Sequence, residues 1–162
     1  MTSIDDGGLR AAEPRDIASI GALIRELALY ERAVDEAVAT DAQLHDAIFG
    51  EDSHVHCHVV EVNGEVVGMA LWFLNFSTWL GTPGIYLEDL FVRAEHRGNG
   101  YGRQLMRALA GICVERGYSR FQWSVLDWNT PSIDFYRSFG AEALDEWTMF
   151  RLSGEALQAF AP

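Results

Sequence analysis

The stretch at residues 86–105, YLEDLFVRAEHRGNGYGRQL, decides the fold. It begins as an apolar, strand-like run that two acidic residues interrupt, and it continues into a loop with glycine at positions 98, 100 and 102. Apolar residues then recur at helical spacing until Gly117. A glycine loop between a strand and a helix N-terminus gathers backbone N–H groups that suit a phosphate. The stretch therefore predicts a strand–loop–helix unit with an anion site, and a tight structural turn is the alternative.

Two common nucleotide-binding motifs do not fit the spacing of this loop. A P-loop ends in Gly-Lys-Ser/Thr, whereas Arg103 and Gln104 follow Gly102 here. The dinucleotide fingerprint is GxGxxG inside a longer βαβ unit, whereas this loop reads GxGxG. The spacing therefore excludes a P-loop and does not match the dinucleotide fingerprint.

The flanking segments predict helices and strands in a clear order. Apolar residues at helical spacing predict a helix from about Ile17 to Tyr30, and a capping box at Thr40 opens another through Phe49. An Asn63-Gly64 pair between two strand-like runs predicts a hairpin. Downstream we expect a strand at 120–126, a helix from Asn129 to about Gly140, and a last strand at 147–152. The fold class is mixed α/β (α+β) in a single domain, residues 1–162, with residues 1–8 disordered.

Composition limits the function classes. The chain has 162 residues, 49% hydrophobic and 22% charged, which is typical of a soluble globular domain. Its 24 acidic and 12 basic residues give a net charge of −12, which argues against nucleic acid and suits a cationic substrate, or merely solubility. Its most apolar window is too short and too interrupted to span a membrane, and the acidic N-terminus is no signal peptide. Cys57 and Cys113 form no CxxC pair, so we expect a reducing cytoplasm.

Several motifs in chain order carry a resemblance to one family. These are LALYE, HCHVVEV, WLGTPGIYLEDLFV, the glycine loop, DWNTPSIDFYRSFGA and the late Trp147. From about Leu9 to Leu152 the chain resembles the GNAT acetyltransferase superfamily, and within it the spermidine/spermine (diamine) and thialysine acetyltransferase group. The resemblance implies a mostly antiparallel sheet, splayed at an acetyl-CoA site and flanked by helices. It also implies a homodimer with active sites near the interface.

The resemblance implies acetyl-CoA as co-substrate and a set of residues that bind it. The fourth-strand residues that would contact the pantetheine arm are Leu90, Phe91 and Val92. The loop residues that would hold the pyrophosphate are Arg97, Gly98, Asn99, Gly100, Tyr101, Gly102 and Arg103. Asn129 and Ser132 match cofactor contacts at the next helix, where Asn129 is equally suited to cap that helix.

Tyr136 and Glu88 match the catalytic residues of the family, with direct attack in a ternary complex. Tyr136 would protonate the CoA thiolate, which a phenol of pKa about 10 can do because a thiol has a pKa of about 8.5. Glu88 matches the proposed base, and Asp89 matches a contact to the amine. In a regular strand these two acids face opposite sides, so one would enter the core, and we therefore expect a bulge or cleft here. Glu88 could instead only attract the cation.

The acceptor is predicted to be a small primary amine. Tyr30, Glu31, Trp79 and Trp147 match positions that line the acceptor site, and each could equally serve packing. Polyamine enzymes carry Asp two positions before the matching tryptophan, where this chain has Ser77. This favours a lysine-like amino acid of the thialysine type over a diamine or polyamine, with protein or peptide amines as a third possibility.

Two further possibilities remain. A non-catalytic acyl-CoA-binding sensor would keep the loop, but we expect it to lack Tyr136 or Glu88, and both are present. His54, His56 and His58 alternate and could bind zinc on one strand face, but the matching family strand has no metal role, so we expect no metal.

Overall fold

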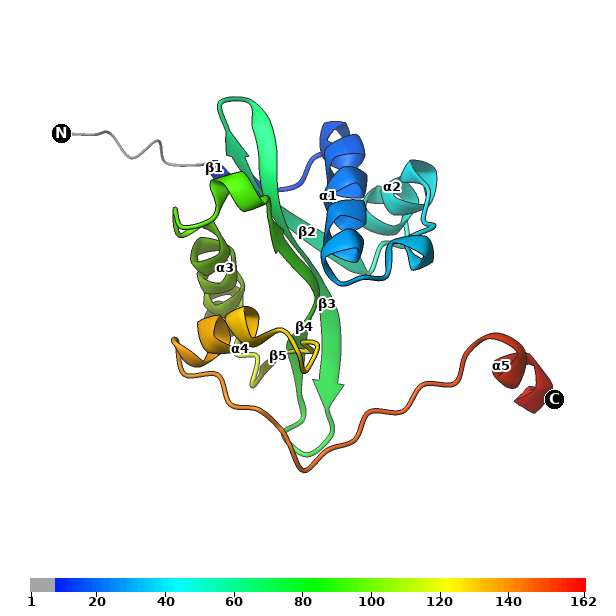
Figure 1. Ribbon diagram of the computed structural model, residues 1–162. Helices are drawn as coiled ribbons and strands as arrows, with labels where there is room; N and C mark the ends of the chain where they lie inside the picture. Colours follow the sequence, from blue (N-terminus) through cyan, green and yellow to red (C-terminus); the bar gives the residue numbers. More distant parts are fainter. Residues whose placement is uncertain (1–7) are drawn as a thin grey trace. The chain divides into compact units, whose positions relative to one another are not determined.

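The computed structural model describes residues 8–162 (Figure 1). The chain divides into two compact units, one that ends at Ser124 and one at Val125–Pro162. A single domain over the whole chain stays a prediction. The prediction of disorder at residues 1–8 lies outside the described residues except at Gly8. There it is wrong, because Gly8 pairs with Glu61 at the start of the first strand.

The first unit contains a five-stranded sheet in the order β1-β2-β3-β4-β5. The first four strands are antiparallel neighbours, and β5 runs parallel to β4. This confirms the mixed, mostly antiparallel sheet. The strands are β1 (Gly8–Ala11), β2 (Val55–Val62), β3 (Glu65–Ser77), β4 (Thr82–Val92) and β5 (Phe121–Trp123).

The Asn63-Gly64 hairpin is confirmed between β2 and β3. Asn63 has φ 51° and Gly64 has φ 81°, so both turn residues are left-handed. Two left-handed residues match the turn whose twist suits paired strands, and Asn and Gly adopt that conformation most easily.

Helices cover both faces of this sheet. α1 (Ile17–Tyr30) and α2 (Asp41–Phe49) lie on one side of the strands, and α3 (Tyr101–Arg116) lies on the other (Figure 1). Short 3₁₀ turns at Pro14–Asp16, Val34–Glu36 and Ala94–His96 connect them. The capping box at Thr40 is confirmed, since its side chain accepts from Gln43 N and the Gln43 side chain accepts in return from Thr40 N. Gly117, with φ 69°, ends α3 as predicted.

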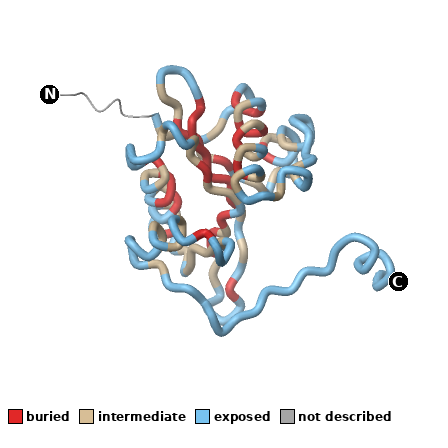
Figure 2. The backbone as a smooth tube through the Cα atoms, viewed as in Figure 1, coloured by how far each residue is buried: buried red, intermediate tan, exposed pale blue. Residues whose placement is uncertain are grey.

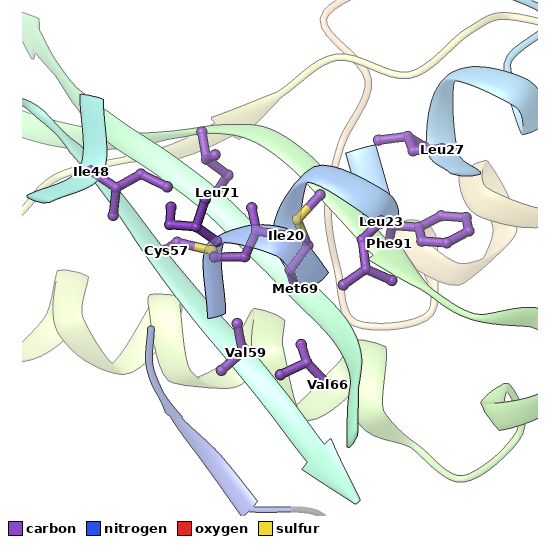
Figure 3. Packing of buried hydrophobic residues seen from close by; sticks show 11 residues of the cluster. Ile20, Leu23, Leu27, Ile48, Cys57, Val59, Val66, Met69, Leu71 and Phe91 are labelled. Atoms are coloured by element: carbon purple, nitrogen blue, oxygen red, sulfur yellow. The ribbon is translucent and has the colours of Figure 1, made fainter. Parts of the chain in front are cut away.

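The main hydrophobic core lies between α1 and the sheet. Figure 2 shows the buried residues concentrated on the strands and on the sides of the helices that face them. Ile20 and Leu23 are fully buried, and burial of such a side chain contributes about 1.5–3 kcal/mol. The side chains they meet, drawn in Figure 3, include Cys57, Val59, Met69, Leu71 and Phe91.

A buried ion pair holds the start of α1 against β1. Asp16, the residue before α1, is buried, and it accepts from Arg10 at 2.6 Å (Nη1 to Oδ2) and 3.0 Å (Nη2 to Oδ1). The backbone N–H of Glu13 donates to the same carboxylate at 2.7 Å. Arg10 also pairs with Glu61 of β2. The hydrogen bonds from Arg10 lower the pKa of Asp16 despite its burial.

The second unit contains α4 (Thr130–Arg137) and α5 (Gly154–Phe160). Asn129 caps α4 by accepting from Ser132 N at 3.4 Å, as predicted. The strand predicted at residues 147–152 is wrong, because this segment forms neither helix nor strand. A strand needs a partner for its backbone groups, and no strand between residues 8 and 162 pairs with this segment. Its apolar side chains are exposed, as Phe150 is at 91%.

None of the helices described for residues 8–162 is both long and apolar enough to cross a membrane.

Candidate active site

A β-bulge in β4 places the two acidic residues of the strand. Leu71 of β3 pairs with Asp89, whereas the next residue, Trp72, pairs with Leu87, so Glu88 is an extra residue in β4. Directly paired residues share a face of the sheet. Asp89 therefore lies on the α1 side with Leu71, while Leu87 lies on the opposite side with Trp72. The predicted bulge is confirmed, and it changes the face on which the strand's side chains lie.

One edge of β4 is open beyond this bulge. β5 pairs only with Ile85, Tyr86 and Leu87. Among the described residues no strand pairs with residues 88–92 on the side away from β3. Backbone groups at such an edge can bind an extended ligand as an added strand would. Leu90, Phe91 and Val92, the predicted pantetheine contacts, lie along this edge.

The glycine loop leads from β4 into α3, as predicted. Gly98 and Gly100 both have φ 83°, a conformation that costs other residues energy, and open space surrounds the position of a Cβ at each. Conformation rather than space therefore requires these two glycines. Gly102, in contrast, lies inside the first turn of α3.

The N-terminus of α3 has features that suit an anion. No side chain caps the helix at Gly100, and its first turn carries Arg103 and no acidic residue. The N–H groups and dipole of the first turn add positive charge there. Asn99 donates to the His96 carbonyl at 3.1 Å, and Tyr101 is buried, so the loop is held on both sides of Gly100.

Arg97 lies against two aromatic rings. Its Nε donates to the Val92 carbonyl at 2.9 Å. Its guanidinium carbon is 5.3 Å from the ring centroid of Tyr30 and 5.4 Å from that of Phe91. The structure thus brings the start of the loop together with the end of α1. Binding of the pyrophosphate by Arg97 stays a prediction.

Three carboxylates gather where α1 ends beside the bulge. Glu88 is exposed, whereas Asp89 is half-buried. Burial, followed by the charges of Glu88 and Glu31, raises the pKa of Asp89 to about 6. Burial also raises the pKa of Glu31, which directly follows α1. A bound cation would relieve this repulsion, so the arrangement suits an amine.

A second ion pair, which the sequence did not indicate, fixes α1 to the end of β4. Arg93 donates from Nε to Glu26 Oε1 at 3.1 Å and also pairs with Glu65. Its backbone N–H donates to the Val67 carbonyl at 2.9 Å. Glu26 and Arg93 are far apart in the chain, so no local spacing could have revealed the pair.

Trp79 is not brought close to Asp89 within one chain. It lies in the turn between β3 and β4 and is 92% exposed. The extended strand from Thr82 to Asp89 is about 20 Å long at about 3.3 Å per residue. A contact between Trp79 and the acceptor stays a prediction.

The other predicted residues belong to the second unit. Asn129 is buried at its capping position, and Ser132 and Tyr136 lie one turn apart on α4, so they share a face. Trp147 follows in the irregular segment and is 70% exposed. The roles predicted for these four residues stay predictions.

Two of the three alternating histidines, His56 and His58, make contacts with Trp72 of β3. The ring of His56 stacks on Trp72 with centroids 4.4 Å apart, and Nδ1 of His58 accepts from Trp72 Nε1 at 3.1 Å. Burial lowers the pKa of both histidines. Within residues 8–162 there is no group of three or more side chains that could hold a metal ion.

Comparisons with known proteins agree on one family. The model of the Acetyltransferase (GNAT) family, whose members use acetyl-CoA, matches residues 22–141. A thialysine N-epsilon-acetyltransferase of Sus scrofa is 38% identical over 164 residues, which cover 94% of this chain and 96% of that protein. A spermidine/spermine N(1)-acetyltransferase-like protein 1 of Homo sapiens is 32% identical over 167 residues, with 97% of this chain but 24% of that protein covered.

Among solved structures, an integron cassette protein from the mobile metagenome of V. cholerae has a TM-score of 0.80 and 26% identity. The match covers 95% of this chain and 96% of that chain.

Proposed function

The chain belongs to the GNAT acetyltransferase family and is an N-acetyltransferase, and from this premise we propose that it acetylates a small primary amine. The acceptor is a lysine-like amino acid of the thialysine type, ahead of a diamine or polyamine. The observation that carries the proposal is the bulge at Glu88, which puts acidic side chains next to the open edge of β4.

The donor side rests on the open edge and the glycine loop. The pantetheine arm of acetyl-CoA lies along Leu90, Phe91 and Val92 and bonds to their backbone groups. Because Phe91 has its side chain in the core, its contact is through the main chain. The pyrophosphate binds at residues 97–103, where the α3 N-terminus favours an anion. Asn129 and Ser132 complete the cofactor contacts.

The acceptor side rests on charge and on the relatives. Glu31, Glu88 and Asp89 favour a cation, and an amine substrate is a cation at neutral pH. The relative that acetylates thialysine matches at higher identity and over far more of its length than the spermidine/spermine-like one. Ser77, which stands where polyamine enzymes carry Asp, is buried and accepts from Leu80 N at 3.2 Å. It therefore serves the turn and offers no charge to a second amine.

The proposed reaction is direct transfer in a ternary complex. The amine attacks the thioester carbonyl, and the backbone N–H near Leu90 stabilises the oxyanion. Tyr136 protonates the departing thiolate. Glu88 and Asp89 attract the ammonium group, and one of them accepts its proton.

The proposal includes a homodimer in a reducing cytoplasm. The apolar side chains of residues 147–152 are exposed in one chain, and a partner could cover them. The two cysteines are free and buried. Light scattering on the purified protein should give the mass of a dimer, and a monomer at micromolar concentration would contradict this part.

The test is a comparison of kcat/KM for thialysine, spermidine and a lysine peptide, with CoA release as the readout. We expect thialysine to be highest and the peptide to be lowest. A higher kcat/KM for spermidine than for thialysine would indicate a polyamine acetyltransferase instead. Tight binding of acetyl-CoA without CoA release on addition of any amine would support the non-catalytic sensor.

A further inference from the structure

Resting on the proposed function, we propose that Asp89, and not Glu88, is the residue that accepts the proton of the attacking amine. The resemblance gave Glu88 this role and Asp89 only a contact to the amine. The position of each side chain around the bulge supports the reverse assignment of these two roles.

The bulge separates the environments of the two carboxylates. Asp89 pairs with Leu71, which in turn pairs with Cys57 of β2, so the three side chains share the α1 side of the sheet. Leu71 and Cys57 both belong to the hydrophobic core (Figure 3). Glu88 is the extra residue and is exposed to solvent. A carboxylate against apolar groups is a stronger base than one in water.

The Asp89 side chain is unpaired, yet solvent reaches it. Among residues 8–162 nothing hydrogen-bonds to it or forms an ion pair with it. At the same time, no buried side-chain oxygen of the described residues is both enclosed and unbonded, so the oxygens of Asp89 touch solvent. The carboxylate is thus able to meet a ligand that enters from solvent.

The groups around Asp89 also favour its protonated form. Glu88 lies on the same strand and Glu31 follows α1, and the charges of both act on Asp89. The thiol of Cys57 on β2 is close enough for the charge of Asp89 to raise its pKa. Two arginines lie on this side without an ion pair to Asp89. The guanidinium of Arg97 lies over the rings of Tyr30 and Phe91, and Arg93 pairs with Glu26 and Glu65. Desolvation and the two glutamates raise the pKa of Asp89 from 3.8 to about 6, which brings it closer to the pKa of an amine.

The proton balance of the step is as follows. The substrate ammonium gives one proton to an oxygen of Asp89, and its nitrogen lone pair then forms the N–C bond to the thioester carbonyl. The C–S bond breaks as the oxyanion collapses, and the thiolate takes a proton from Tyr136. Tyr136 recovers its proton from the nitrogen of the new amide. Asp89 releases its proton to water through its solvent-exposed side, so one proton leaves for each acetyl group transferred.

The experiment is a pH profile of kcat/KM and of kcat for wild type, Asp89→Asn and Glu88→Gln with the amine that the wild type acetylates best. In the wild type kcat/KM, which reports the pKa of the free enzyme, should rise tenfold per pH unit below about pH 6 and then level off. Glu88→Gln should keep this limb and raise KM. Asp89→Asn should lose the limb, with kcat lower by about 10²–10⁴-fold. Asp89→Glu, which keeps a carboxylate, should restore part of the activity and of the limb. Glu115→Gln on the exposed side of α3 serves as a charge-matched control.

The outcomes separate this inference from the proposed function. Wild-type activity with an unchanged limb in Asp89→Asn, or a limb lost in Glu88→Gln, would overturn the assignment alone. A wild type that acetylates no amine would overturn the proposed function and the assignment together. Carboxyl NMR gives a readout without substrate, in which an Asp89 midpoint near pH 6 supports the assignment and one below about 4.5 overturns it.

Discussion

Asp16 and Asp89 lie near opposite ends of α1, and the same kind of side chain has opposite properties at the two places. Asp16 directly precedes the helix and receives three hydrogen bonds, two of them from Arg10. Glu31 directly follows the helix, and its charge raises the pKa of Asp89. Asp89 has no hydrogen-bond or ion-pair partner among the described residues. Cys57 of β2 is affected by both charges, and its pKa rises to about 12, mainly through burial.

Burial acts in the same direction on both carboxylates, so the difference comes from the partner. Desolvation favours the protonated form of each, but Arg10 outweighs it at Asp16 and lowers the pKa. At Asp89 the neighbouring charges are negative and add to desolvation. In the fold the ionised form of Asp16 is therefore favoured over its protonated form, whereas ionisation of Asp89 reduces stability and leaves a charge available to a ligand.

The largest effect on stability should come from Asp16→Asn. This change leaves Arg10 partly buried with only Glu61, and the loss of one partner of a buried pair costs about 3–5 kcal/mol. Urea unfolding at pH 7 measures the loss, with Asp52→Asn in an exposed turn as the control. A loss below about 1 kcal/mol would mean that the pair does not stabilise the fold.

The same pair sets a pH dependence. Because the folded pKa of Asp16 is lowered, its contribution is present above the unfolded value of 3.8 and is lost as the pH falls through the folded pKa. The difference between wild type and Asp16→Asn should therefore shrink in acid.

Asp89→Asn should have the opposite effect on the free energy of unfolding. A rise in pKa from 3.8 to about 6 means that ionised Asp89 destabilises the fold by at most about 3 kcal/mol. The destabilising contribution of Asp89 is therefore absent below pH 3.8, grows as the pH rises from 3.8 to about 6, and is fully present above that. Asp89→Asn should raise the free energy of unfolding at pH 8 and leave it nearly unchanged at pH 3.5. A variant that is less stable than wild type at pH 8 would show that Asp89 has a stabilising partner after all.

Glu26→Gln should cost about 1 kcal/mol or less, because the side chain of Glu26 is 40% exposed. Arg93 keeps Glu65, so the fold survives. This variant tests whether the position of α1 against β4 affects the site, since Glu31 acts on Asp89 across this contact. A carboxyl NMR titration should show a lower pKa of Asp89 in the variant. An unchanged pKa would show that the ion pair between Glu26 and Arg93 does not affect the site.

Glu13→Gln should change stability least, by less than Glu26→Gln. Its pair with Arg15 is exposed on both sides, and such pairs contribute little. Thermal melts of this variant and of Asp16→Asn, recorded together, compare an exposed and a buried ion pair on the same 3₁₀ turn. Equal shifts in Tm would contradict the distinction between the two pairs.

Local patterns predicted much of this fold. The Asn63-Gly64 turn, the capping box at Thr40 and the stop at Gly117 are each set by a few neighbouring residues, and all three are confirmed. The bulge was also predictable, because two acids in succession cannot both avoid the core in a regular strand.

Features that depend on distant partners were not predictable. The segment at 147–152 has the residues of a strand but forms none, since a strand depends on what lies beside it. The pairs of Arg10 with Asp16 and Arg93 with Glu26 bring together elements that the sequence keeps apart. Alternation also shows that Glu88 and Asp89 face different ways, but not which of them is buried. That depends on where the extra residue sits.

The bulge has a consequence for how β4 would tolerate loss of a residue. If Glu88 were deleted, Leu87 and Asp89 would become neighbours and would still pair with Trp72 and Leu71, now in an unbroken ladder. Every apolar side chain of the strand would remain on its present face. The sheet itself therefore has no need of Glu88, and a bulge interrupts backbone hydrogen bonding. A chain shortened by this one residue should fold as well as the parent, so any activity that it loses would measure what the extra residue contributes to acetyl transfer.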